Sequence, residues 1–517
     1  MLFVDDLGYG DPGFTGNPSA RTPSLDRLSA QGRRLTNWYS GYPVCSASRT
    51  ALLTGRQPPR VGMVGVINSL TAAGLPLSEI TVADELRSAG YATLALGKWH
   101  QGQLPQYLPM QRGFDEFLGL PFSVDDGVGY LSPCSGSSSS DAAARAAASI
   151  ERPRLKAGLG PLLPLPLLRQ SRHDNTSIIV EQPTDLRLLT SRLLTRATDF
   201  IREHSGNKWF TYFAFGHVHT ATPSISKDRQ YSGCAFANTT ARPFLDALSE
   251  VDHAVGTLLS EIDSLSLSSS TLTIFTSDNG PSIRWSLGAG SAGLFTGSSA
   301  TYSDGRPYRN TAKGSTWEGG IRMPAFIHWP SVVPSGSSSY SVVSTLDVMP
   351  SLMQLVKRPP LSDRVVDGTL SLYDAIVGDG SIPTRHAFLP LYNNPVYGNA
   401  SKHIYAGRYQ NYKAHWITSP GLTPHSATSP SPSWAHKVPL IFDIDADPSE
   451  AYPIKEADLP VGLLDSVEKA KAAAEQRLTP TSIPMAWGYE HALCCGIGCT
   501  KPCACQCKNV PLPVLPP

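Results

Sequence analysis

The sequence predicts an α/β fold: a mixed, mainly parallel sheet covered by helices on both faces, followed by a smaller antiparallel sheet. Short apolar runs alternate with helical patterns through the first 360 residues, which is typical of a mainly parallel sheet. Later, short runs at 403–406, 412–416 and 439–443 suit a small antiparallel sheet. We therefore predict two domains, residues 1–360 and residues 361–517.

Several elements of the first domain have recognisable ends. Residues 22–32 combine a capping threonine, a first-turn proline, an apolar stripe and a terminal glycine, which predicts a helix. A second helix is predicted over 81–89, ended by Gly90, and a third over 244–262, where apolar residues recur at helical spacing. A strand-like run at 271–276 follows, so strand and helix continue to alternate.

The charge balance excludes some classes of function. The 517 residues include 43 Lys plus Arg and 42 Asp plus Glu, with no long run of either sign, which argues against binding nucleic acid or a membrane surface through net charge. No segment approaches the roughly 20 uninterrupted apolar residues of a membrane span. We predict a soluble protein, in which any anionic substrate is held by a local site.

The cysteines indicate an oxidising compartment. Zinc sites usually show two separated C-x2-C pairs, which the cysteine-rich tail lacks, so a disulfide knot is favoured over a metal cluster. Sequons at Asn175, Asn238 and Asn399 agree with secretion and a glycoprotein. Six of the nine cysteines lie in this tail, at Cys494, Cys495, Cys499, Cys503, Cys505 and Cys507.

Three segments are set aside from the site. An apolar strand run follows Met1 at once, with no signal peptide before it, so we predict a truncated amino terminus and leave lysosomal and secreted locations open. The Ser/Ala-rich stretch at 132–149 and the Ser/Pro-rich stretch at 419–433 are predicted to be surface insertions that carry no chemistry.

Polar clusters stand at the carboxyl ends of four predicted strands. In an open α/β sheet ligands bind beyond those ends, so the four clusters together point to one shared site. Taken singly, each has an ordinary structural explanation as a turn, a cap or a surface charge. The clusters are Asp5 with Asp6, Lys98 with His100, His217 with His219, and Asp278 with Asn279.

The residue types in these clusters indicate the chemistry. Three carboxylates and an amide oxygen are hard ligands that suit calcium or magnesium better than zinc, and we predict Ca²⁺ with Mg²⁺ as the alternative. Three cationic side chains beside such a metal would neutralise a tetrahedral oxyanion. The predicted substrate is therefore a sulfate or phosphate ester.

Cys45 has two readings from its local sequence. Residues 48–54 read as a helix ended by Gly55, which places Cys45 at or near a helix amino terminus, where N–H groups and the dipole favour an anion. Alternatively, it is a small buried cysteine packed under the sheet. The local residues leave both readings open.

Longer motifs resemble those of the type I sulfatases, the formylglycine-dependent family, and in particular its arylsulfatases. Residues 45–55, CSASRTALLTG, resemble the signature C-x-P-x-R followed by a short helix and T-G, and GKWH at 97–100 resembles the second signature. DDLGYG at 5–10 and SDNG at 277–280 resemble the two metal motifs. Lys313 and the WEGGIR run after it complete the family's order. The resemblance implies an alkaline-phosphatase-like fold.

The resemblance also implies a mechanism. A formylglycine-generating enzyme would oxidise Cys45 to formylglycine (3-oxoalanine), and its hydrate would attack the sulfur of an aryl sulfate, a sulfolipid or a sulfated sugar. The metal ligands would be Asp5, Asp6, Cys45, Asp278 and Asn279. The implied catalytic residues are Cys45, Arg49, Lys98, His100, His219 and Lys313. The implied substrate contacts are Lys98, Ser123, His219 and Lys313.

Within this mechanism Arg49, Lys98 and Lys313 grip sulfate oxygens, and His219 or Lys313 protonates the departing alcohol. His100 then takes the proton of the second hydroxyl of residue 45, so that sulfate leaves and the aldehyde forms again. The resemblance further implies the tail disulfides Cys494–Cys505, Cys495–Cys507 and Cys499–Cys503.

Two positions depart from the family pattern. Ala47 stands where most relatives have proline, and modification of Cys45 is still expected. The histidine segment carries two candidates, and we predict His219 rather than His217 because it stands nearer Pro223.

Two other functions compete with that of a sulfatase. One is a phosphomonoesterase or phosphodiesterase of the alkaline phosphatase superfamily, which Cys45 with Arg49 disfavours. The other is a non-catalytic protein that binds sulfated glycans, which the retention of every charged motif residue disfavours. The sequence is compatible with an oligomer.

Overall fold

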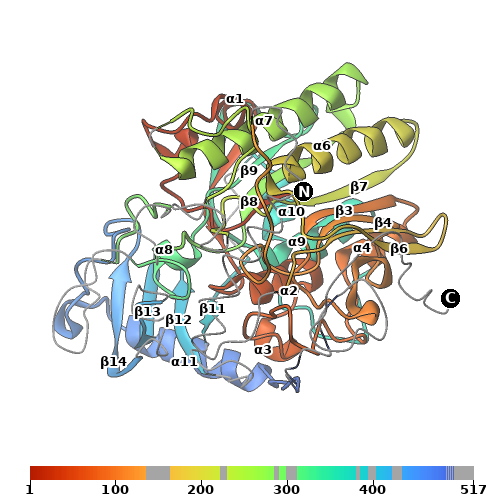
Figure 1. Ribbon diagram of the computed structural model, residues 1–517. Helices are drawn as coiled ribbons and strands as arrows, with labels where there is room; N and C mark the ends of the chain where they lie inside the picture. Colours follow the sequence, from red (N-terminus) through yellow and green to blue (C-terminus); the bar gives the residue numbers. More distant parts are fainter. Residues whose placement is uncertain are drawn as a thin grey trace, which may run out of the picture.

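The computed structural model describes residues 1–134, 163–221, 230–240, 242–283, 290–297, 311–379, 385–393, 403–421 and 433–484, with 486, 488, 491 and 493. It confirms the predicted fold class, with one large, mainly parallel sheet flanked by helices and a separate small antiparallel sheet (Figure 1). No helix in this part of the chain is long and apolar enough to cross a membrane.

The large sheet has ten strands. They are β1 (Leu2–Val4), β2 (Arg33–Tyr39), β3 (Ala92–Lys98), β4 (Glu116–Leu120), β5 (Leu167–Ser171), β6 (Thr176–Glu181), β7 (Trp209–Ala214), β8 (Thr273–Ser277), β9 (Phe326–His328) and β10 (Ser337–Ser344). Their order is β10-β2-β9-β8-β1-β7-β3-β4-β5-β6. At the centre, β8, β1, β7, β3 and β4 are parallel, whereas β9 is antiparallel to both of its neighbours. The antiparallel strands β5 and β6 form one edge.

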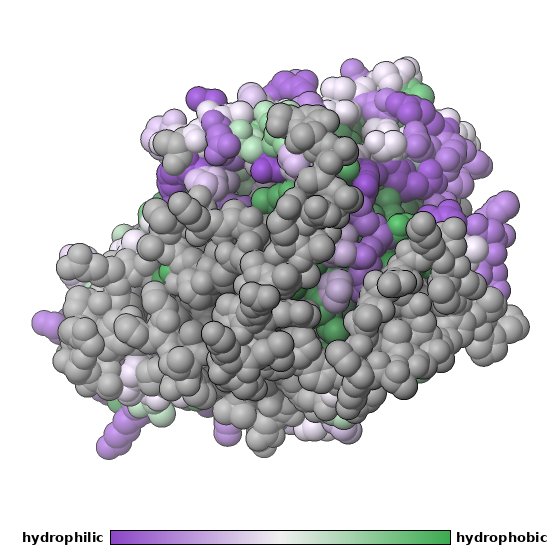
Figure 2. Space-filling view, in the orientation of Figure 1, coloured by the Kyte–Doolittle hydropathy of each residue, from purple (hydrophilic) through white to green (hydrophobic). Residues whose placement is uncertain are grey.

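Helices cover both faces of this sheet (Figure 1). In β1, Leu2 and Val4 join the core beneath one set of helices, and Phe3 joins the core on the opposite face, as the alternation of a strand requires. Central strands are therefore apolar on both sides. The first face carries α1 (Pro23–Gln31), α6 (Leu186–Glu203) and α7 (Pro243–Ser264), and the second carries α2 (Cys45–Thr54), α4 (Val82–Ser88), α9 (Val348–Leu355) and α10 (Ser371–Val377). The outer surface over α6 and α7 is mostly hydrophilic (Figure 2).

The predicted helices form, with local differences at their starts. Thr81 caps α4 in a capping box with Asp84. Thr22 precedes α1 but does not cap its backbone, because its hydroxyl accepts from the Gly13 N–H at 2.9 Å and donates to a carboxylate one turn along. Helix α2 begins at Cys45 itself, three residues before the predicted run.

The small sheet has the order β11-β12-β13-β14 and is antiparallel throughout. Leu463 and Val467 of the last helix pack on it. The strands are β11 (Leu389–Tyr392), β12 (Ile404–Tyr409), β13 (Tyr412–Thr418) and β14 (Trp434–Asp443), and the helix is α11 (Leu463–Arg477). Helix α10 packs into the core of the large sheet. The domain boundary at residue 360 stays a prediction.

Short helices complete the described structure. Two are α-helical, α3 (Pro58–Val61) and α8 (Glu318–Ile321). The 3₁₀ helices are η1 (Gly13–Thr15), η2 (Pro105–Tyr107), η3 (Pro109–Gln111), η4 (Ser268–Ser270), η5 (Thr345–Asp347) and η7 (Glu456–Asp458).

A disulfide joins Cys134 to Cys234, a pair that the sequence did not predict. Among the described cysteines, Cys45 alone is unpaired. The predicted tail disulfides, Asn399, and most of the stretches 132–149 and 419–433 lie outside the described residues. Asn175 and Asn238 are exposed.

Candidate active site

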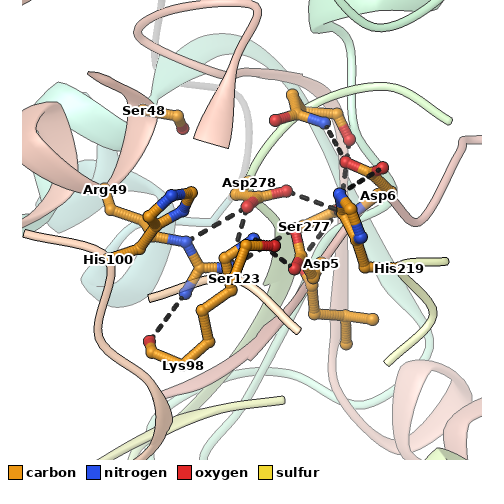
Figure 3. A network of polar contacts seen from close by, with 12 residues as sticks. Asp5, Asp6, Ser48, Arg49, Lys98, His100, Ser123, His219, Ser277 and Asp278 are labelled. Atoms are coloured by element: carbon orange, nitrogen blue, oxygen red, sulfur yellow. Dashed lines mark hydrogen bonds and ion pairs between the residues drawn. The ribbon is translucent and has the colours of Figure 1, made fainter. Parts of the chain in front are cut away.

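The four polar clusters meet at one edge of the large sheet. Asp5 and Asp6 follow β1, and Asp278 follows β8; Lys98 is the last residue of β3, and the segment with His219 follows β7. Because β8, β1, β7 and β3 are parallel neighbours, their carboxyl ends lie side by side. The predicted site residues therefore gather into one buried cluster (Figure 3).

Each predicted carboxylate is paired with a predicted cation. Lys98 Nζ lies 2.6 Å from Asp5 Oδ2, and Lys313 Nζ lies 2.6 Å from Asp6 Oδ1. The guanidinium of Arg49 donates two hydrogen bonds to Asp278 Oδ2, at 2.8 and 3.2 Å. Burial would lower the pKa of Lys98, but the charges of Asp5 and Cys45 together outweigh it and the pKa is raised. The three carboxylates and three cations therefore balance.

Several oxygens of this cluster remain unsatisfied. Asp5 Oδ1, Asp6 Oδ2 and Asn279 Oδ1 are buried without a hydrogen-bond partner. Asn279 donates its amide N–H to Asp6 Oδ1 at 2.7 Å. Asp5, Cys45 and Asp278 each offer a ligand atom, and these atoms lie within 4.8 Å of one another. Buried unsatisfied oxygens are rare, and a hard cation would satisfy all three. The donor set therefore fits a metal ion.

Cys45 is the first residue of α2 and is buried. No side chain caps this helix at Val44, so the first-turn N–H groups face the site without a capping side chain. Arg49 stands one turn further along α2, on the same side as Cys45. Burial raises the pKa of the Cys45 thiol to about 11, although Lys313 and Lys98 oppose this shift. The thiol is neutral near pH 7 and is a poor nucleophile in this form.

His100 has a defined tautomer. Its Nε2 lies 2.7 Å from the carbonyl oxygen of Ile67, and because a carbonyl only accepts, Nε2 carries the hydrogen. Its Nδ1 therefore holds a lone pair, and this atom is buried without a partner. Burial, followed by the charges of Lys98 and Arg49, holds the pKa of His100 well below its usual value. The ring is neutral and can accept a proton at Nδ1.

The two histidines after β7 face different surroundings. The ring of His217 lies against Tyr231, with 4.2 Å between ring centroids, and its Nε2 is 3.2 Å from Glu250 of α7. The Nε2 of His219 is 3.5 Å from Asp6 Oδ2, and its Nδ1 is 2.8 Å from the carbonyl oxygen of Thr220. His219 thus borders the acidic cluster (Figure 3), whereas His217 contacts α7 through Glu250.

Ser123 also joins the cluster, since its hydroxyl accepts from Lys98 Nζ at 3.0 Å. Two further acidic residues, Asp125 and Asp126, border the site and were not predicted from the sequence. Asp125 Oδ1 is 3.7 Å from His219 Nδ1, and Asp126 Oδ2 is 4.0 Å from His100 Nε2. The available signal was an acidic pair shortly after a strand, as at Asp5 and Asp6, but a following glycine makes it read as a turn.

The chain matches two family models, Sulfatase over residues 1–357 and the C-terminal region of aryl-sulfatase over residues 385–507. It is 36% identical to human arylsulfatase A over 532 residues, which cover 98% of this chain and 95% of the relative. It is 32% identical to mouse steryl-sulfatase, over 93% of this chain and 82% of the relative.

Solved structures share this architecture. The PsFucS1 sulfatase from Pseudoalteromonas sp. superposes with a TM-score of 0.75 and 25% identity, covering 94% of this chain and 91% of that one. The phosphonate monoester hydrolase of Agrobacterium radiobacter has a TM-score of 0.52 and 16% identity, over 92% and 95% of the two chains, and so shares the fold alone. The fold and the family that the sequence motifs predicted are both confirmed.

Proposed function

The chain belongs to the sulfatase family, and on that premise we propose that it hydrolyses sulfate esters with a formylglycine made from Cys45 and one bound calcium ion. The observation that carries the proposal is the placement of Cys45. It lies at a helix amino terminus, beside the carboxylates of Asp5 and Asp278, in a cluster that also holds three buried cations. An unmodified, neutral cysteine would not require the carboxylates and buried cations that surround this position.

Calcium fits the donor set better than a transition metal. The ligands would be oxygens of Asp5, Asp6, Asp278 and Asn279, together with residue 45. When bound, the ion would supply Lewis-acid stabilisation for a sulfate oxygen and for the nucleophile. The three carboxylates are already balanced by three cations, so a divalent ion would make the site net positive. A net positive site would favour a sulfate group over neutral ligands.

The cations would hold the sulfate. Lys98 has three N–H donors, of which Asp5 and Ser123 take two. Lys313 meets Asp6 in a similar way. We propose that both ammonium groups contact sulfate oxygens, and that the Ser123 hydroxyl does so when it turns from the Asp125 carboxylate to the sulfate. Arg49, bound to Asp278 and to the Lys98 carbonyl oxygen, would mainly orient this arrangement.

Two histidines would move protons. The hydrated aldehyde of formylglycine would supply the hydroxyl that attacks sulfur, which a serine with one hydroxyl could not release again. His219, when both of its nitrogens carry a proton, would protonate the departing oxygen from Nε2, or Lys313 would do so. His100 would accept a proton from residue 45 at Nδ1, the atom that lacks a partner. In each ring the other nitrogen already faces a carbonyl oxygen.

We further propose that the protein is a lysosomal or secreted glycoprotein. The exposed disulfide Cys134–Cys234 and the exposed sequons at Asn175 and Asn238 support an oxidising compartment.

The test is hydrolysis of 4-nitrophenyl sulfate and 4-nitrophenyl phosphate by protein made with a formylglycine-generating enzyme, beside a mass spectrum of the peptide with residue 45. We expect an aldehyde at residue 45 and turnover of the sulfate. In Cys45→Ala turnover should fall at least about 10⁴-fold with thermal unfolding unchanged, since only the nucleophile is lost. Unmodified Cys45 without turnover would instead support a binding protein, and faster phosphate hydrolysis would support a phosphoesterase.

A further inference from the structure

Asp125 differs from the other acidic residues of the site in its exposure. Its side chain is 44% exposed, whereas those of Asp5, Asp6 and Asp278 are at most 3% exposed. Asp125 lies in the turn closed by the Asp126 N–H and the Ser123 carbonyl oxygen, at 3.0 Å. A carboxylate that borders the cluster and still contacts water stands where the rest of a substrate must lie.

Asp125 contacts both residues proposed to meet the reacting ester on this side. Its Oδ1 is 3.7 Å from His219 Nδ1, and its carboxylate accepts a hydrogen bond from the Ser123 hydroxyl. Ser123 in turn accepts from Lys98. Partial loss of water contact would raise the pKa of Asp125, but the charges of His219 and Lys98 and the bond from Ser123 hold it below the usual value. Asp125 is therefore a carboxylate near neutral pH.

The position of Asp125 follows from those of Lys98 and Ser123. A sulfate oxygen bound by Lys98 Nζ would lie beside the Ser123 hydroxyl, which Asp125 also contacts. Groups on the carbon next to the ester carbon would then come near the carboxylate. A carboxylate accepts hydrogen bonds strongly and repels other anions.

On the basis of the function proposed above, we propose that Asp125 determines specificity by contacting the alcohol part of the ester. It accepts a hydrogen bond from a hydroxyl on the carbon adjacent to the ester and disfavours a second sulfate there. The substrate class is thus a monosulfated polyol, such as a sugar unit with one sulfate and a free neighbouring hydroxyl.

Three synthetic esters that differ in one group test this inference. They are 2-hydroxycyclohexyl sulfate, 2-methoxycyclohexyl sulfate and cyclohexane-1,2-diol disulfate, with sulfate release measured for the formylglycine-containing enzyme. We expect kcat/KM of the wild type to favour the hydroxy ester over the methoxy ester by about 10- to 100-fold, the size of a hydrogen bond to a charged group. The disulfate should be the poorest substrate.

Two variants separate charge from hydrogen bonding. Asp125→Ala should bring the hydroxy and methoxy esters to within about threefold of each other. Asp125→Asn keeps an acceptor, so it should retain part of that preference while turning over the disulfate faster than the wild type does. Asp174→Ala is the matched control, because Asp174 is 45% exposed and lies 3.7 Å from Arg169, on a hairpin between β5 and β6. Its ratios should equal those of the wild type.

Unchanged ratios in both Asp125 variants would overturn the inference, even if all rates fell together, because a general loss would mean that Asp125 only orients His219. Failure of the proposed function would look different. In that case the wild type would turn over none of the three esters although residue 45 carried the aldehyde.

Discussion

A second buried ionic cluster in the described part of the chain, called the closed cluster below, differs from the site because all of its carboxylate oxygens are bonded. The closed cluster consists of Glu318 on α8, Lys413 and His415 on β13, and Glu450, all fully buried. Lys413 Nζ is 2.8 Å from Glu318 Oε1 and 3.1 Å from Glu450 Oε1, which also meets His415 at 2.8 Å. The remaining oxygens accept from the Tyr39 hydroxyl and the Glu318 backbone N–H. All four carboxylate oxygens are bonded.

The site cluster is as deeply buried but leaves oxygens of Asp5, Asp6 and Asn279 without hydrogen bonds. Burying an unpaired charged oxygen is costly, so such atoms persist where something from outside completes them. A cluster whose carboxylate oxygens are all bonded can serve the fold alone, whereas a cluster with unbonded buried oxygens indicates a ligand. This difference separates the structural carboxylates from those proposed to bind calcium.

The closed cluster also supports the site. Trp317 stacks on His415, with 4.3 Å between ring centroids, and so joins the small sheet to the segment that carries Lys313. Gly314 donates to the Pro43 carbonyl oxygen at 2.8 Å and accepts from Asn393 at 2.7 Å. The small sheet therefore holds one cation of the site in place.

The largest effect on stability is expected when the shared cation of the closed cluster is removed. Lys413→Met leaves two buried glutamates without their shared cation, and we expect the free energy of unfolding to fall by about 3–5 kcal/mol. Denaturant unfolding measures it, with the exposed Lys469→Met on α11 as a control within about 0.5 kcal/mol of wild type. Activity per folded molecule should persist. A stable but inactive Lys413→Met would place this cluster in the chemistry instead.

Calcium binding to the site cluster should raise the free energy of unfolding. Calcium at 100 times its dissociation constant should stabilise the fold by about 2.7 kcal/mol, because it binds the folded state alone. Asn279→Ala removes one unpaired oxygen and should need more calcium for the same rise in melting temperature, whereas Lys413→Met should show the wild-type rise. If calcium moved no melting temperature, the open oxygens would require another explanation.

The smallest expected effect is a pH dependence in the closed cluster. Burial holds the pKa of His415 below 6.5, although Glu450 opposes the shift, so the folded state favours the neutral ring. This contribution to stability is complete above pH 6.5 and is lost as the pH falls toward the lowered pKa, by at most about 1.4 kcal/mol per pH unit.

Unfolding measured between pH 7 and 5 should therefore have a shallower slope in His415→Gln than in the wild type. The exposed His403 offers a control, since His403→Gln should keep the wild-type slope. Equal slopes in all three proteins would mean that His415 has the same pKa folded and unfolded.

Much of the architecture was predictable because it depends on local patterns. Apolar runs that end in Asp5 or Asp278 predict strands, and parallel neighbours bring their ends together without further information. The helix at Cys45 was predicted for the same reason, although its start was placed three residues late. Sequence patterns therefore predicted which side chains would gather at one edge of the sheet.

Contacts between distant segments had no such local signal. Glu318 and Lys413 are 95 residues apart, and Cys134 and Cys234 are 100 residues apart. The sequence around Asp125 has only the pattern of a turn. Its contact with His219 depends on where the segment after β7 lies in the fold. No periodicity or spacing encodes these pairings.

By itself, then, the sequence determined the fold class, the family and the set of reactive groups, since each rests on short-range order and on motifs in their chain order. Only the tertiary structure decided which lysine meets which carboxylate, which oxygens stay open and which nitrogen of His100 holds its lone pair. Hydrogen bonds and ion pairs act over about 3–4 Å, and distances of that size between remote residues are set by the packing of the whole sheet.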